Sequence, residues 1–343
     1  MPLKRLLPAA IALTITALAV VPAAGQSASP AAGTASTGSG QTVTIAAVGD
    51  MECSHGEQEA PFRAKRYGQC WGRQVSDLLV NGDYAAFLAV GDLQYLHGNY
   101  AKFQKYYDPT FGRVKDITYP VPGNHEGYTK KFRGYFQYFG REKAHAPGGY
   151  YSYNLGDWHL IGLNSQLCKN RTWDTKTRWQ HHLKLGRCHP GSPQYRWLKH
   201  DLATHPNSEY PCTLAYWHHP LYKWSYWAIR KHRVYARPFW RLLYAAHADI
   251  VLNGHWHNYQ RFAPMNPRGE TDPNGISEFI VGMGGDTHNH LNGLLKKPVG
   301  LEAANGTAYG IEQFDLKPTG YDYKFIPAEG QPDFSDSGSA ECH

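Results

Sequence analysis

The chain has 343 residues, of which 42% are hydrophobic and 14% aromatic, so it has enough apolar side chains for the core of a sizeable globular domain. Its formal net charge is +7; the first 40 residues contain Lys4 and Arg5 and no acidic residue, so the remainder carries 7 − 2 = +5. The basic residues are scattered and form no stripe, which argues against a nucleic-acid-binding protein, whereas a mild positive charge favours small anionic substrates.

The N-terminus has the pattern of a secretory signal peptide. Lys4 and Arg5 precede an apolar stretch over residues 6–21, which is shorter than the roughly 20 residues of a membrane-spanning helix, and residues 22–25 offer cleavage sites. We therefore expect residues 1–25 to be a signal peptide, and the product to be secreted without a membrane anchor. Residues 26–41 are mainly Ser, Ala, Gly and Thr, which predicts a disordered linker before one catalytic domain over residues 42–343.

The six cysteines also agree with export. All of them follow the predicted leader and none belongs to a CxxC pair, so three disulfides in an oxidising compartment are expected. Six cysteines allow 15 connectivities. We favour Cys53–Cys70 and Cys168–Cys188, each of which closes a local loop, and this leaves Cys212–Cys342 as the third pair.

Short apolar runs, many of them rich in β-branched or aromatic residues, predict buried strands. They are residues 43–48, 85–90, 117–121, 159–163, 213–217, 250–252 and 279–281. Helices are predicted between them, at residues 72–80, 100–107, 193–204 and 237–247. In the third helix, Ser192 is suited to be the N-cap and Pro193 fits the first turn. Strands that alternate with helices favour an α/β sandwich over an all-β fold.

Five of the predicted strands run directly into residues that can bind metal ions. The segments that follow them are GD at 49–50, GDLQY at 91–95, PGNHE at 122–126, HHP at 218–220 and NGHWH at 253–257. Ligand sites in open α/β sheets lie beyond the carboxyl ends of the strands, so we expect these five distant loops to converge.

The side chains in these loops are oxygen and nitrogen donors: Asp50, Asp92, Tyr95, Asn124, His218, His255 and His257. Such donors suit Fe, Mn or Zn in an open site better than a closed structural zinc site. Two ions about 3.5–4 Å apart need a bridging carboxylate and open positions for water and substrate. His255 and His257 are two residues apart, so an extended backbone between them suits neighbouring ions.

In this order the motifs resemble those of the calcineurin-like metallophosphoesterases, and within them the purple-acid-phosphatase-like branch. The family pattern is GD, GDxxY, GNH[DE], a His after a strand, and GHxH; this chain has GDMEC, GDLQY, GNHE, AYWHHP and GHWH. Secreted bacterial members with PVPGNHE, WHLIGLNS and AYWHHPLY segments are especially similar. The resemblance implies a four-layer α/β/β/α sandwich with the metal site at the carboxyl ends of the strands.

The resemblance also implies the ligands of two metal ions. One ion is expected to be held by Asp50, Asp92, Tyr95 and His257, and the other by Asp92, Asn124, His218 and His255, so that Asp92 bridges. Tyr95 is the feature of the purple branch, where a phenolate binds Fe(III) and gives a visible charge-transfer band. Iron with Zn, Mn or a second Fe is therefore the expected pair, with no organic cofactor.

Two positions depart from the pattern without removing a ligand. Glu52 stands where many relatives have His or Gln and the purple branch commonly has Gly, and it is expected either near the metals or facing solvent. Gln260 stands where Glu is common.

The expected reaction is hydrolysis of phosphate monoesters by attack of a metal-bound hydroxide on phosphorus, in line with the leaving oxygen. His125 follows the predicted ligand Asn124 and is the candidate for protonating the leaving group or binding a phosphoryl oxygen; alternatively it only braces the loop. Glu126 is a candidate for orienting His125, and His219 for shaping the pocket. The resemblance implies that Asp92 is the bridging residue of this catalytic centre.

Two other functions remain open. A phosphodiesterase or nucleotidase would use the same metal centre, because substrate choice depends on loops such as 53–72, 165–192 and 222–237 rather than on the motifs. A catalytically silent binding protein is disfavoured because all seven predicted ligands are present. The expected partner is a small phosphate ester, and the sequence contains no pattern that identifies a partner protein.

Overall fold

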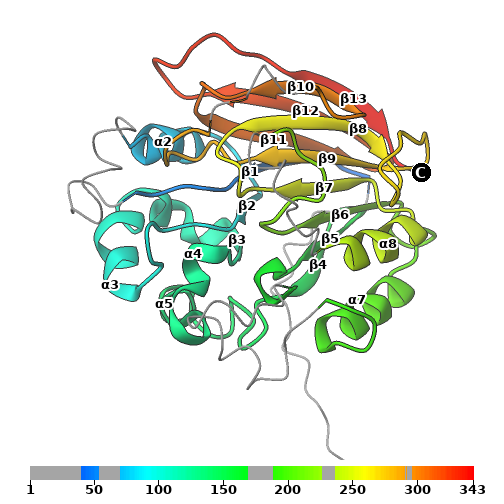
Figure 1. Ribbon diagram of the computed structural model, residues 1–343, viewed down its shortest axis with the longest axis horizontal. Coiled ribbons are helices and arrows are strands. Elements are labelled where there is room, and N and C mark those ends of the chain that lie inside the picture. Colours follow the sequence, from blue (N-terminus) through cyan, green and yellow to red (C-terminus); the bar gives the residue numbers. More distant parts are fainter. Residues whose placement is uncertain (1–39, 54–69, 169–187, 226–235, 290, 292–295) are drawn as a thin grey trace, which may run out of the picture. The chain divides into compact units, whose positions relative to one another are not determined.

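The computed structural model describes residues 40–53, 70–168, 188–225, 236–289, 291 and 296–343, which belong to one compact unit (Figure 1). The predicted signal peptide and nearly all of the predicted linker lie outside these residues. No helix in the described part of the chain combines the length and the apolar character that crossing a bilayer requires.

The first of two β-sheets has six strands in the order β13-β12-β11-β1-β2-β3. Its strands are β1 (Val43–Val48), β2 (Ala86–Val90), β3 (Thr118–Val121), β11 (Gly310–Lys317), β12 (Gly320–Pro327) and β13 (Ser337–Glu341). The strands β1, β2 and β3 are parallel, whereas β11 is antiparallel to β1 and continues into an antiparallel ribbon with β12 and β13. Every residue of β2 is buried, which explains its continuous apolar sequence.

The second sheet has seven strands in the order β10-β8-β9-β7-β6-β5-β4. They are β4 (Tyr151–Leu155), β5 (Trp158–Gly162), β6 (Cys212–Tyr216), β7 (Ile250–Asn253), β8 (Tyr259–Met265), β9 (Ile276–Val281) and β10 (Leu301–Asn305). The central strands β5, β6, β7 and β9 are parallel, and β4, β8 and β10 are antiparallel to their neighbours.

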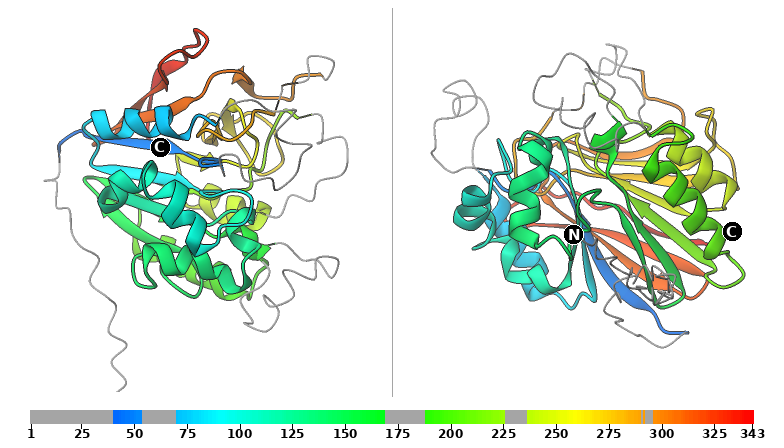
Figure 2. Two further views of the ribbon diagram at one scale, coloured as in Figure 1. Left: turned by 90° about the vertical axis from the view of Figure 1, so that its left-hand side faces the viewer. Right: turned by 90° about the horizontal axis from the view of Figure 1, so that it is seen from below.

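The two sheets pack face to face around a shared apolar core. Leu88 of the first sheet and Leu160, Leu214 and Phe279 of the second belong to this core. Helices cover the outer face of each sheet, as Figure 2 shows from two further directions. On the first sheet they are α2 (Gly72–Asn81), α3 (Tyr100–Lys102) with η1 (Phe103–Tyr107), and α5 (Arg133–Phe139). On the second they are α7 (Pro193–Thr204) and α8 (Arg237–Ala245).

This arrangement is the four-layer α/β/β/α sandwich that the sequence predicts. The seven predicted strands are present within one to three residues, and the four predicted helices are also present. Ser192 caps α7 as expected, because its side chain accepts a hydrogen bond from the backbone N–H of Tyr195. The prediction omitted β4, β8, β10, β11, β12 and β13, and the short helices η2 (Phe111–Ile117), α4 (Asn124–Gly127), η3 (Lys130–Phe132) and η4 (Ser165–Cys168), as well as α5.

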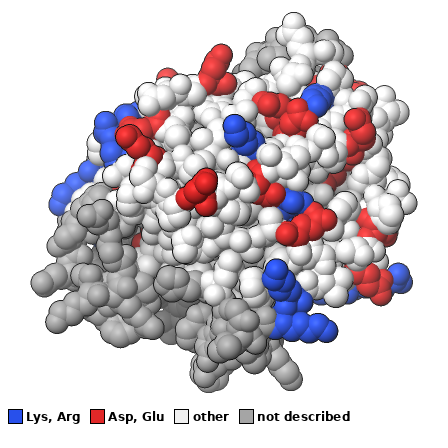
Figure 3. Space-filling model, turned by 90° about the horizontal axis from the view of Figure 1, so that it is seen from above, with Lys and Arg blue, Asp and Glu red and all other residues white. Residues whose placement is uncertain are grey.

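The three predicted disulfides are all present. Cys53–Cys70, Cys168–Cys188 and Cys212–Cys342 have Cα–Cα distances of 6.0, 4.7 and 5.4 Å, which fall in the usual range for a disulfide. The third joins the start of β6 to the residue after β13. On the face shown in Figure 3, acidic and basic side chains are interspersed, in agreement with the scattered charge of the sequence.

Candidate metal centre

The loops that follow β1, β2, β3, β6 and β7 meet at the carboxyl ends of these strands. Parallel pairing places β1, β2 and β3 side by side in one sheet and β6 and β7 side by side in the other. The two sheets therefore bring their polar loops to the same place, and the donor-rich segments that are far apart in the sequence become neighbours.

Tyr95 lies at the centre of the first group of donor atoms. Its hydroxyl oxygen is 2.9 Å from Asp50 Oδ1, 3.3 Å from Asp92 Oδ2 and 3.0 Å from His257 Nε2. Tyr95 and Asp50 are buried, and the side chain of His257 is only 13% exposed. These are the four residues that the sequence predicts around one ion.

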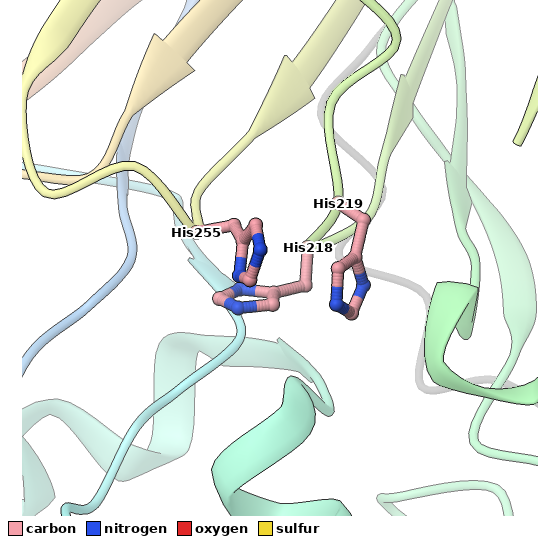
Figure 4. A group of neighbouring side chains, drawn as sticks. All are labelled: His218, His219 and His255. Carbon is pink, nitrogen blue, oxygen red and sulfur yellow. The ribbon is translucent and has the colours of Figure 1, made fainter. Parts of the chain in front are cut away.

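Asp92 connects this group to a second one. Its Oδ2 atom, which faces Tyr95, is also 2.9 Å from His218 Nε2. The rings of His218 and His255 have centroids 5.1 Å apart, and Figure 4 shows how these two residues and His219 gather at the ends of β6 and β7. The Oδ1 atom of Asn124 is buried and has no hydrogen-bond partner among the described residues. The structure thus brings six of the predicted ligands into contact with one another, and Asn124 follows Gly123 on the adjoining loop.

The backbone of these loops is unusual at the ligands themselves. Asp50, Asp92 and His255 have φ angles of 56°, 50° and 73°, in the left-handed region that non-glycine residues rarely adopt. The adjacent Gly123 permits a close approach, since a Cβ atom there would lie 2.2 Å from Asp92 Oδ1. Local strain is therefore concentrated where the side chains must point into the centre.

Backbone carbonyl groups orient two of the histidines. Nδ1 of His218 is 3.0 Å from the carbonyl oxygen of Val90, and Nδ1 of His257 is 2.6 Å from that of Thr287. A carbonyl oxygen can only accept, so the proton of each neutral ring lies on Nδ1 and the Nε2 lone pair faces the other donors. That tautomer is the one a metal ligand at Nε2 requires.

Burial and close charged neighbours together determine the electrostatics of the group. Burial raises the pKa of Asp50 to about 6, and burial together with Asp50 raises the pKa of Tyr95 well above its ordinary value. Burial acts to raise the pKa of Asp92 as well, but His218 and His125 hold it below its ordinary value. Burial acts to lower the pKa of His218, and the Asp92 carboxylate outweighs it and raises that pKa to about 9. A bound cation would stabilise the ionised forms of Asp50, Asp92 and Tyr95.

Glu126 has a different role from the one expected. Its carboxylate accepts hydrogen bonds from the backbone N–H groups of Asp92, Leu93, Gln94 and Gly123, at 2.8–3.2 Å. It therefore fixes the loop after β2 against the loop after β3. His125 is oriented instead by the carbonyl oxygen of Leu96, which is 2.5 Å from its Nδ1, and by its backbone N–H, which donates to Asp92 Oδ1 at 2.7 Å.

The two departures from the family pattern lie outside the group of donors. Glu52 is fully buried rather than facing solvent, and its carboxylate lies against Gly72 at the start of α2. Gln260 accepts a hydrogen bond from the backbone N–H of Trp224 at 2.6 Å and donates to the carbonyl oxygen of Trp224 at 3.1 Å, so it positions the chain beyond β6.

One nearby acid was not predicted. Asp286 is 6% exposed, and its Oδ2 atom lies 3.5 Å from His257 Nδ1 without a hydrogen-bond partner in the described parts of the chain. The Gly284-Gly285 pair before it is the feature of the sequence that could have indicated its position. Glycine is needed at residue 284 because a Cβ atom there would lie 2.5 Å from the carbonyl oxygen of Gly49. This close approach brings Asp286 beside the loop of Asp50.

Comparison with known proteins agrees with this geometry. The model of the family described as calcineurin-like phosphoesterase matches residues 43–259. The chain belongs to this family. Purple acid phosphatase 15 of Arabidopsis thaliana is 29% identical over 239 residues, which cover 65% of this chain and 40% of the relative. Probable purple acid phosphatase 20 of the same plant is 27% identical over 248 residues, which cover 66% and 50%. The chain thus spans half or less of the length of these relatives.

Solved structures share the fold. A purple acid phosphatase from seeds of yellow lupin (Lupinus luteus) aligns with a TM-score of 0.63 and 16% identity over 88% of this chain and 54% of the lupin chain. At such identity the likeness concerns the fold alone. The family implies a dinuclear metal centre, and the residues present fit one. Two carboxylates, a phenol and three imidazoles are in contact with one another, and the buried Asn124 Oδ1, on the neighbouring loop, has no hydrogen-bond partner among the described residues.

Proposed function

We propose that this protein hydrolyses phosphate monoesters at a dinuclear metal centre. The observation that carries the proposal is the position of the Tyr95 hydroxyl, within 3.3 Å of Asp50, Asp92 and His257, with His218 on the other side of Asp92. One ion would be held by Asp50, Asp92, Tyr95 and His257, and the other by Asp92, Asn124, His218 and His255. When bound, such a pair of ions supplies an activated water and neutralises charge on the phosphoryl group.

The protein's own contribution is to position the substrate and to hold a proton. His125 is 8% exposed, and the Leu96 carbonyl oxygen engages its Nδ1, so that Nε2 faces the centre 3.8 Å from Asp92 Oδ2. This atom is placed to donate to a phosphoryl oxygen or to the leaving oxygen when the ring is protonated. Burial lowers the pKa of His125 to about 4, so the protonated ring belongs to acidic conditions.

The metals and the location of the protein are part of the same proposal. Tyr95 supports Fe(III) at the first position, with Zn, Mn or Fe at the second, because a phenolate is a ligand suited to a trivalent hard cation. We further propose that residues 1–25 are a signal peptide, residues 26–41 a linker and residues 42–343 the catalytic domain of a secreted protein. The three disulfides support an oxidising compartment.

Two alternative functions are a phosphodiesterase or nucleotidase and a catalytically silent binding protein. A phosphodiesterase or nucleotidase would use the same seven residues, and the loops that choose between esters include residues 54–69, 169–187 and 226–235, which lie outside the described residues. A silent binding protein would not need the left-handed backbone at Asp50, Asp92 and His255. Because the similar proteins are named purple acid phosphatases, we place the monoesterase first and the diesterase second.

The test compares p-nitrophenyl phosphate with bis-p-nitrophenyl phosphate, with metal analysis and a visible spectrum on the same sample. We expect faster hydrolysis of the monoester, its loss in Asp92→Ala, and a visible band that disappears in Tyr95→Phe. Asp333→Asn, which changes an exposed acid near the C-terminus, is the control and should behave as the wild type. Faster hydrolysis of the diester would favour the second function, and no turnover of either ester with any added metal would refute the enzyme proposal.

A further inference from the structure

Three histidines gather where β6 and β7 end, and one of them has no place in the ligand set. A ring nitrogen of each of His218, His219 and His255 lies within 4.8 Å of the other two (Figure 4). His218 and His255 are proposed ligands of the second ion. His219 is also buried, with 7% of its surface exposed, and its ring centroid is 4.4 Å from that of His255. His219 could be a third nitrogen ligand of the second ion or a hydrogen-bond donor to the substrate, and the position of its ring proton distinguishes the two.

The answer depends on Ser165, a fully buried residue of η4. Its hydroxyl oxygen accepts a hydrogen bond from the backbone N–H of His219 at 3.1 Å and lies 2.8 Å from Nδ1 of the same residue. These are the only hydrogen-bond partners of the Ser165 hydroxyl in the described residues. A hydroxyl group has one proton to donate, and within the described parts of the chain Nδ1 of His219 is the only acceptor in its reach. Ser165 therefore donates to Nδ1, and the proton of the neutral His219 ring lies on Nε2.

This tautomer is the opposite of the one found at the neighbouring ligand. Nδ1 of His218 faces the carbonyl oxygen of Val90, which leaves a lone pair on Nε2 for a metal. Nε2 of His219 carries a proton and has no lone pair in the ring plane to offer. His219, whose Nδ1 faces a hydroxyl group, is therefore suited to donate a hydrogen bond from Nε2. His218, whose Nδ1 faces a carbonyl group, is suited to bind a metal ion through Nε2.

The ring of His219 is also held in place. The indole N–H of Trp217 donates to the carbonyl oxygen of His219 at 2.8 Å, which fixes the backbone. The rings of His218 and His255 lie 4.9 and 4.4 Å from its centroid, so the ring has neighbours on the side of the proposed second ion. A donor that is oriented before the substrate arrives loses little freedom on binding it.

We propose that His219 is a substrate-contacting residue that donates its Nε2–H to a phosphoryl oxygen beside the second ion, and that Ser165 is the positioning residue that sets its tautomer. The proposal rests on the proposed function, since it needs a phosphoryl group in the centre. It assigns to His219 a task that none of the seven proposed ligands performs.

Phosphate binding and metal content test the proposal without relying on turnover. Inorganic phosphate is titrated into the zinc-reconstituted protein by calorimetry, and the zinc content of each sample is measured. His219→Leu removes the donor, and His219→Gln keeps an N–H near the position of Nε2. We expect every variant to keep the zinc content of the wild type, with phosphate affinity about 10- to 100-fold weaker in His219→Leu and largely restored in His219→Gln. His189→Leu, at an exposed histidine, should match the wild type.

The outcomes separate this proposal from the one on which it rests. If the wild type with its zinc ions bound no phosphate, the proposed function itself would fail. If the wild type bound phosphate and His219→Leu bound it equally well, only the assignment of His219 would fail. If His219→Leu lost zinc, His219 would be a ligand and the tautomer argument would be wrong.

A spectroscopic measurement tests the role of Ser165. In the zinc-loaded protein with 15N-labelled histidine, the His219 signals are identified by their loss in His219→Leu. We expect a protonated Nε2 and an unprotonated Nδ1 in the wild type, and a changed distribution of the proton in Ser165→Ala, with phosphate affinity about 3- to 10-fold weaker. A protonated Nδ1 in the wild type would overturn the proposal, because Nε2 would then have the lone pair of a ligand.

Discussion

The carboxylate of Glu126 accepts a hydrogen bond from the backbone N–H of Asp92 at 3.0 Å, although the two residues follow different strands. The same oxygen accepts from Gly123, and the other carboxylate oxygen accepts from Leu93 and Gln94. A buried charge is tolerated here because four N–H groups solvate it. One side chain thus fixes the loop that carries Asp92, the proposed bridging ligand, relative to the loop that carries Asn124.

Replacing Glu126 with Gln should destabilise the protein. One oxygen of the carboxylate becomes an NH2 group, which cannot accept, so two buried backbone N–H groups lose their partner at a cost of about 1–3 kcal/mol each. We expect the free energy of unfolding to fall by about 2–4 kcal/mol and the affinity for metal ions to fall with it. Thermal unfolding and metal analysis of the same samples measure the two effects.

Glu329→Gln is the matched control for this substitution, since Glu329 is exposed and lies far from the centre in the chain. It should unfold like the wild type and bind metal equally well. A Glu126→Gln variant with unchanged unfolding would mean that the carboxylate does not support the two loops.

The two proposed ion positions can be separated by single substitutions. His257 contacts Tyr95 and Asp50, whereas His218 contacts Asp92, so each ring belongs to one position. We expect His257→Ala and His218→Ala each to retain about one ion per chain, and Asp92→Ala to retain none, because only Asp92 is a proposed ligand of both ions. Elemental analysis after gel filtration measures this, with His189→Ala, at an exposed histidine, as a control outside the centre. Two ions per chain in His257→Ala would contradict the ligand assignment.

The Cys212–Cys342 disulfide should stabilise the protein more than Cys53–Cys70. It links residues 130 apart, against 17 for the other, and a longer closed loop restricts the unfolded chain more. In the chain-entropy model the losses are about 5 and 3 kcal/mol. Thermal unfolding of the two paired Cys→Ser variants compares them. An equal or smaller loss at Cys212 and Cys342 would show that loop length does not determine the contribution here.

The sequence predicted the parallel strands well because these strands are buried, and buried strands consist almost entirely of apolar residues. All five residues of β2 are buried, so its sequence is an unbroken apolar run. The strand β13 is different: it has the sequence SGSAE, most of it exposed, and it is a strand because it pairs with β12. A strand that depends on its partner leaves little signal in its own residues.

The same distinction applies to the site. That the loops of the seven proposed ligands meet could be predicted, because each loop follows a strand in a recognisable motif and the strands determine where the loops lie. Glu126, Asp286 and Ser165 could not be assigned in this way. Their roles depend on which backbone or ring atoms distant segments bring to them, and such contacts have no fixed spacing in the sequence.

Glu278 gives a prediction about pH. This buried residue of β9 accepts hydrogen bonds from the backbone N–H groups of Leu221 at 2.8 Å and Tyr222 at 2.9 Å, and so fixes the chain that follows His218 and His219. Burial raises the pKa of Glu278 from 4.5 to about 8, despite these hydrogen bonds.

The direction of the effect on stability follows from proton binding. Between about pH 4.5 and pH 8 the folded protein holds a proton on Glu278 that the unfolded chain has released, so the contribution of this residue to the free energy of unfolding falls as pH rises. The total change is of the order of a few kcal/mol, at about 1.4 kcal/mol per unit of pKa.

Glu278→Gln cannot lose a proton and should lack this part of the pH dependence. Melting temperatures of the metal-free proteins between pH 5 and pH 8 measure the difference. We expect the wild type to lose stability relative to Glu278→Gln over this range, while Glu329→Gln follows the wild type. Parallel curves for the wild type and Glu278→Gln would mean that Glu278 has the same charge in the folded and unfolded protein.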